Sequence, residues 1–106
     1  GWRIASRRPG IGSGGAPRPL VHELSLALEV CRLAEEVMIR ERGVAVRSLG
    51  VEVGRDAGVE LDNFRFCLDA IMQEPPFVGG SAEYLPAAGI DLRLAYVEVD
   101  DGRPDD

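Results

Sequence analysis

The sequence predicts an α+β fold in which two helices pack on one face of a small three-stranded sheet. Segments 22–42 and 60–73 repeat apolar residues at steps of three and four, the period of an amphipathic helix. Segments 44–53, 81–85 and 90–97 alternate apolar and polar residues, the period of a strand with one buried face. The element order is therefore α-β-α-β-β. Helices gathered on one face of a sheet are the simplest way to bury both kinds of apolar face.

The first helix carries the strongest pattern. Its apolar residues form a wide face, as expected for a helix that lies on a sheet. Glu23 in the first turn and Arg40 near the end complement the helix dipole, and Gly43 follows as a C-terminal cap. Two adjacent stripes are expected to make the apolar face: Leu24, Ala27, Leu28, Cys31, Ala34 and Met38, and beside them Leu26, Val30, Leu33 and Val37.

The remaining elements define one crossover and one tight connection. In the strand at 44–53, Leu49, Val51 and Val53 share a face. The second helix stops before Pro75-Pro76. The first strand, the second helix and the second strand form a crossover that should be right-handed. The last two strands, joined only by Pro86-Ala87-Ala88-Gly89, are predicted to be antiparallel neighbours.

Charge divides the chain into three parts. Residues 1–20 hold four arginines, five glycines, three prolines and no acid. Such a composition resists regular structure, so this segment is predicted to be a flexible basic arm. Residues 21–99 form the folded domain, and residues 100–106 an acidic tail. The whole chain has a net charge of −6.

Composition excludes several classes of function. Apolar runs are too short to span a membrane, and the acidic body argues against a general nucleic-acid binder. A single histidine rules out a multi-histidine metal cage, and no nucleophile or acid/base constellation can be assembled, so we expect no enzyme. Cys31 and Cys67 fall inside predicted helices and are expected to be small core residues. A reducing, cytoplasmic compartment is the default for such a chain.

Residues 21–27 read Val-His-Glu-Leu-Ser-Leu-Ala and resemble the Met-His-Glu-Leu-Ser-Leu-Ala opening of a known family. This family is HypA/HybF, the nickel metallochaperones of NiFe-hydrogenase maturation. The likeness covers roughly residues 21–100 in order. Its later matches are Val51-Glu52-Val53-Gly54, Gly58-Val59-Glu60, Phe64-Arg65-Phe66, Pro76, Gly80-Ser81-Ala82-Glu83-Tyr84 and the closing Leu92-Arg93-Leu94-Ala95-Tyr96-Val97-Glu98-Val99.

The resemblance implies nickel binding at His22 and Glu23. At the start of a chain, a free α-amine, backbone amides and an imidazole can give Ni(II) a square-planar nitrogen set. Twenty residues precede the motif here, so Val21 contributes a peptide nitrogen. An amine next to His22 exists only in a chain that starts at residue 21. We therefore expect weak nickel binding in the longer chain.

The family that the chain resembles also has a zinc domain, and this sequence differs from the family at the place of that domain. The family inserts two Cys-x-x-Cys pairs between its last two strands, where this chain has four residues and no cysteine. We expect no zinc, and loss of any partner surface that the zinc domain supplies.

Two hypotheses remain open. The first is a nickel-delivery accessory protein whose partners, by resemblance, are a HypB-type GTPase and the NiFe-hydrogenase large subunit. The second is a zinc-less relative that carries no metal and serves as an interaction or assembly subunit. Either way we expect a non-monomeric state, a homodimer or a larger complex, with the basic arm at the contact.

Overall fold

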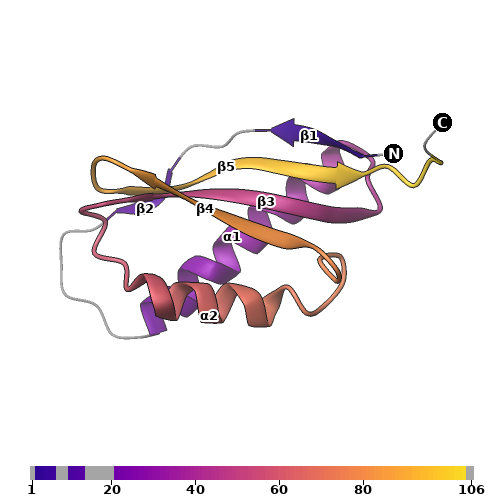
Figure 1. The fold of residues 1–106 in the computed structure, drawn as a ribbon. Helices are drawn as coiled ribbons and strands as arrows, with labels where there is room; N and C mark the ends of the chain where they lie inside the picture. Colours follow the sequence, from indigo (N-terminus) through magenta and orange to yellow (C-terminus); the bar gives the residue numbers. More distant parts are fainter. Residues whose placement is uncertain (1, 7–9, 14–20, 105–106) are drawn as a thin grey trace.

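The computed structural model describes residues 2–6, 10–13 and 21–104 (Figure 1). These ranges contain two helices and five strands. They are β1 (Trp2–Ser6), β2 (Gly10–Ser13), α1 (Val21–Arg40), β3 (Ala45–Gly54), α2 (Leu61–Ile71), β4 (Ser81–Ala87) and β5 (Asp91–Asp100). Neither α1 nor α2 combines the length and the apolarity that crossing a membrane requires.

The predicted fold class is confirmed. Both helices lie on the same side of the sheet formed by β3, β4 and β5 (Figure 1). β3 and β4 run parallel, with Ser48 opposite Ser81 and Gly54 opposite Ala87. The segment between them contains α2, so these three elements form the predicted crossover.

The predicted pairing of the last two strands is wrong. β5 pairs antiparallel with β3, on the side away from β4, so that β3 lies between them. The link between β4 and β5 passes the end of β3, where the N–H of Arg55 donates to Ala87 O and the N–H of Asp56 to Gly89 O, each at 2.8 Å. In this arrangement the backbone of the most buried strand is hydrogen-bonded on both sides.

The arm predicted for residues 1–20 differs from the structure at two places. β1 and β2 both pair antiparallel with β5, opposite its C-terminal and N-terminal halves respectively. Ladder hydrogen bonds join backbone groups, so a segment without an alternating apolar pattern can still add to a free edge. The rest of the predicted arm lies outside the described residues. At the other end β5 continues to Asp100, the first residue of the predicted acidic tail.

The core lies between the helices and the sheet. α1 buries one face and leaves Leu24 and Leu28 exposed, contrary to prediction, because two full stripes are wider than the surface that a sheet covers. Leu61 of α2 is likewise partly exposed. The largest fully buried side chains are Phe64, Leu49, Leu68, Leu92, Leu94, Val30, Val37, Val46, Val51, Val97 and Val99.

On the opposite face of the sheet, Tyr96 lies over Gly50. A Cβ placed on Gly50 would overlap the Tyr96 ring. The Tyr96 hydroxyl donates to Glu83 Oε1 at 2.6 Å, and Ser48 Oγ donates to Glu98 Oε1 at 2.5 Å. Burial and the neighbouring Glu83 raise the pKa of Tyr96 to about 12. This face therefore carries a hydrogen-bonded polar cluster rather than an apolar surface.

We expect Gly54→Ala to destabilise the protein because the added methyl would lie 2.5 Å from Gly89 O and 2.7 Å from Asp91 O. Both neighbours are backbone atoms, so the link between β4 and β5 must move. Overpacking of this kind lowers the free energy of unfolding by about 1–3 kcal/mol, measured by urea denaturation. The exposed neighbour Arg55→Ala is the control and should change it little. Equal stabilities for the two variants would show that the link between β4 and β5 does not pack closely against Gly54.

Candidate functional site

The two residues predicted to bind nickel lie in the first turn of α1. His22 is half-buried, whereas Glu23 is only 3% exposed. Glu23 Oε2 accepts a hydrogen bond from the backbone N–H of Glu60 at 3.1 Å. Glu60 is the N-cap of α2, and its own carboxylate accepts from the N–H of Asp62 at 3.1 Å. One buried carboxylate thus joins the starts of both helices.

This contact gives Glu23 a structural role that sequence reasoning missed. A buried carboxylate is stabilised by the donors that it accepts from, and the N–H groups at a helix start favour negative charge. The Gly58-Val59-Glu60 match placed Glu60 in the resemblance, but nothing in the spacing of residues 23 and 60 predicts that they touch. Glu23 therefore takes part in a contact between α1 and α2 within the folded domain.

Among the described residues, no group of three or more His, Cys, Asp or Glu side chains is placed to hold a metal ion. The first turn of α1 contains the imidazole of His22, the carboxylate of Glu23 and backbone groups. A square-planar nitrogen set would therefore need backbone nitrogens in addition to the imidazole.

The cysteines take the structural places predicted for them. Cys31 is buried in the core. Cys67 is half-buried and packs against the core cluster, and both cysteines are free thiols. Burial, with a smaller contribution from Glu35, raises the pKa of Cys31 to about 12. Because the thiolate is the reactive form, Cys31 is not a nucleophile at neutral pH.

No family model matches the chain. Curated relatives nevertheless share one name, hydrogenase maturation factor HypA. The protein from Albidiferax ferrireducens is 30% identical over 79 residues, which cover 74% of this chain and 70% of the relative. The chain belongs to the HypA family.

Other HypA proteins give the same result at similar coverage. The one from Azotobacter vinelandii is 30% identical over 69 residues, 65% of this chain and 61% of its own length. The one from Polaromonas naphthalenivorans is 39% identical over 69 residues, 65% of this chain and 60% of its own. The resemblance seen in the sequence is confirmed. The chain spans about three fifths to seven tenths of the length of these HypA relatives, whose names place them in hydrogenase maturation.

We expect Glu23→Ala to destabilise the protein because the N–H of Glu60 would lose the charged acceptor that joins it to α1. Loss of a hydrogen bond to a charged group lowers the free energy of unfolding by about 1–3 kcal/mol, measured by urea denaturation. Glu35→Ala is the matched control, since Glu35 lies on the exposed side of the same helix. Equal effects of the two changes would show that the Glu23–Glu60 contact contributes nothing.

The folded protein should protect Cys31 from alkylation. Its raised pKa and its burial both suppress the thiolate, so iodoacetamide at pH 8 should leave Cys31 unmodified until urea unfolds the chain. Peptide mass spectrometry locates the adduct. Rapid modification of Cys31 in the native protein would show that α1 opens readily.

Proposed function

We propose that this HypA-family protein is a nickel-binding accessory protein, a metallochaperone, in NiFe-hydrogenase maturation. It binds Ni(II) as cargo and transfers it through protein contacts, without catalysing a reaction. The proposal rests on the His22-Glu23 motif, together with relatives that are named for hydrogenase maturation. We propose the HypB-type GTPase and the hydrogenase large subunit as partners. The free thiols fit a reducing cytoplasm, and no zinc is required.

The His22-Glu23 motif carries the proposal, and the hydrogen bond between Glu23 and the N–H of Glu60 is consistent with it. This hydrogen bond holds the first turn of α1 against α2, so the backbone around His22 has a defined orientation. A pre-organised site loses less entropy when it binds its ligand. In this proposal the imidazole of His22 and neighbouring backbone nitrogens bind nickel, and Glu23 positions them.

A second candidate function is a HypA-like assembly subunit that carries no metal. The same contact favours it, because a carboxylate buried at a helix junction is useful to the fold whether or not nickel binds. In that case the surface of the domain, rather than His22, would be the functional feature.

Nickel titration separates the two candidates. A chain that starts at residue 21 has an amine beside His22 and should bind about one Ni(II) in a diamagnetic square-planar form. His22→Ala should abolish this binding. The 106-residue chain should bind far more weakly, because Val21 then offers a peptide nitrogen that must first lose its proton. Calorimetry gives the affinities, and the visible absorption of square-planar nickel reports the geometry.

The shorter chain lacks β1 and β2, so its circular dichroism and urea midpoint must be recorded alongside. Equal affinity of the two chains would overturn the terminal-amine geometry. If His22→Ala binds nickel as tightly as the unaltered protein, nickel binding at this motif is excluded and the assembly subunit is the better reading.

A further inference from the structure

In the described part of the chain, β4 is the one long strand with a free edge. β1 and β2 cover the outer edge of β5, and β3 has partners on both sides, whereas β4 pairs only with β3. Ala87 O faces β3, since it accepts from the N–H of Arg55. Backbone groups alternate in direction along a strand, so those of Ala82 and Tyr84 face outward.

Proline at position 86 belongs to the same outward set and ends this row of donors. Proline occurs in sheets where its missing N–H faces away from a partner strand, which fits that position. The exposed edge therefore offers the N–H and C=O groups of Ala82 and Tyr84, a short row that can take one added strand.

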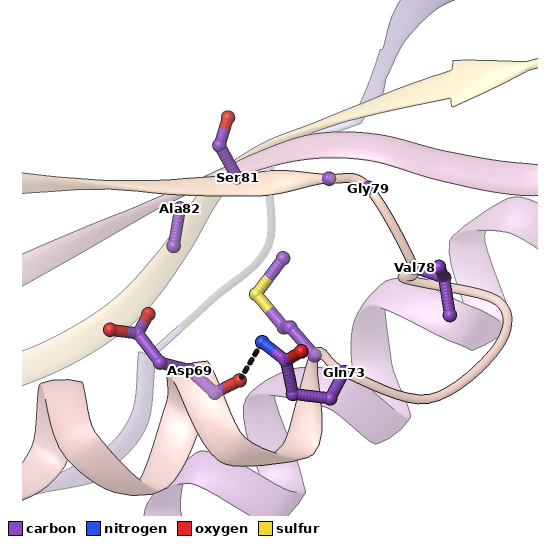
Figure 2. Close-up of a pocket in the computed structure, with 8 residues that line it drawn as sticks. Asp69, Gln73, Val78, Gly79, Ser81 and Ala82 are labelled. Carbon is purple, nitrogen blue, oxygen red and sulfur yellow. Dashed lines mark hydrogen bonds between the residues drawn. The ribbon is translucent and has the colours of Figure 1, made fainter.

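A first pocket of about 390 Å³ lies between the start of β4 and the end of α2. Figure 2 shows Asp69 on α2 and Gln73 in the turn just after it, with Ala82 pointing from β4 toward the helix and Ser81 pointing away. The amide of Gln73 donates to the backbone oxygen of Asp69 at 3.3 Å. The exposed Val78 is at the rim. This pocket presents a carboxylate with no cation beside it on the lining, so it suits a basic side chain.

A second pocket, also about 390 Å³, lies between the end of β4 and the start of α2. Its lining combines the apolar Val59, Leu61 and Pro86 with the cationic residues Arg55 and Arg65. Both arginines are exposed. This pocket suits a side chain with an acidic end. The two pockets, which lie at the two ends of β4, thus carry side chains of opposite charge.

Tyr84 lies on β4 between Ala82, which lines the first pocket, and Pro86, which lines the second. Its ring meets Phe64 edge to face at 6.1 Å between centroids, and the Arg65 guanidinium lies 4.9 Å from its centre. Its hydroxyl is buried and has no hydrogen-bond partner among the described residues. Because this hydroxyl is enclosed by the domain, Tyr84 contributes its ring, and not its polar end, to the second pocket.

We propose that this groove, defined by β4, α2 and the two pockets, binds an extended segment of a partner protein as an added antiparallel strand. Backbone bonds to Ala82 and Tyr84 supply affinity, and the pockets supply specificity, as in other cases of strand addition. Ala82 and Pro86 are four residues apart, about 13 Å at the rise of a strand. The bound segment carries an acidic residue toward the arginine pocket and, four positions later, a basic residue toward Asp69.

A second copy of this chain is the less suitable occupant. The chain carries a net charge of −6, and two copies joined through β4 would bring their Glu83 residues together on one strand pair. Pro86 on the edge also blocks pairing along the full length of β4, a common protection against self-association.

The second pocket includes Val59 and Leu61 on either side of Glu60, the residue that donates to Glu23, so this end of the groove lies near the start of α1. The proposal nevertheless uses neither His22 nor Glu23 and does not depend on nickel binding.

The test uses the ¹⁵N-labelled 106-residue protein and two seven-residue peptides. One, acetyl-TETVTRT-amide, places Glu, Val and Arg on one face in the order that an antiparallel strand needs. The other, acetyl-TRTVTET-amide, reverses the charges. We expect the first to shift the amide resonances of Ala82 and Tyr84 and to bind about fivefold more tightly than the second, the size expected from two exposed ion pairs.

A pair of charge-swapped variants tests the pockets. Arg65→Asp combined with Asp69→Arg exchanges two exposed residues one turn apart on α2 and should abolish or reverse the preference between the peptides. The matched control, Arg32→Glu combined with Glu36→Arg, exchanges an exposed pair at the same spacing on α1, away from the groove, and should leave the preference unchanged.

Three outcomes overturn the proposal. The first is that neither peptide shifts Ala82 or Tyr84 at millimolar concentration. The second is that both peptides bind equally and the α2 swap changes nothing. The third is a shift of the same amides with protein concentration alone, which would make a second copy the occupant. None of these bears on nickel titration, so failure here is distinct from failure of the proposed function.

Discussion

The central position of β3 determines the rest of the architecture. This strand pairs with β4 on one side and with β5 on the other, while Leu49 and Val51 are buried beneath the helices. This position requires the chain to cross from β4 to β5 past the end of β3, and Gly54 leaves room for the link to pass. It also places β4 on one side of β3 and β5 on the other. The groove beside α2 and the pairing of β1 and β2 both follow from that division.

Sequence patterns predicted the helices and strands well because the spacing of apolar residues that defines each one lies within that segment. Apolar residues at a spacing of three or four must form a helix to share a face, and alternating residues must form a strand. α1, β3 and α2 therefore appear within a few residues of their predicted bounds. The exposed Leu24 and Leu28 mark the limit of this reasoning. Periodicity identifies the apolar side of a helix, whereas only the shape of the sheet decides how much of that side is covered.

Strand order could not be read from the sequence in the same way. A short link between β4 and β5 favours a hairpin, yet it can equally cross the end of a third strand when a glycine permits close approach. The crossing arrangement lets β3 pair with a strand on each side, and this gain in backbone pairing exists only in the assembled sheet. The nickel motif shows a similar division. His22 and Glu23 were recognised from their sequence, but the contact of Glu23 with Glu60 joins residues 37 positions apart and appears only in three dimensions.

The side chain of Tyr96 also occupies the space above Gly50, which has no side chain of its own. The ring fills the space that Gly50 leaves empty, so it shields the backbone of the central strand from water on the face that no helix covers. The amide hydrogens of β3 should consequently exchange with solvent as slowly as those of a strand covered on both faces. The two positions are sterically coupled. Any side chain at position 50 displaces the ring and frees Glu83, whereas a small residue at position 96 uncovers the glycine, so relatives of this chain should change both positions together or neither.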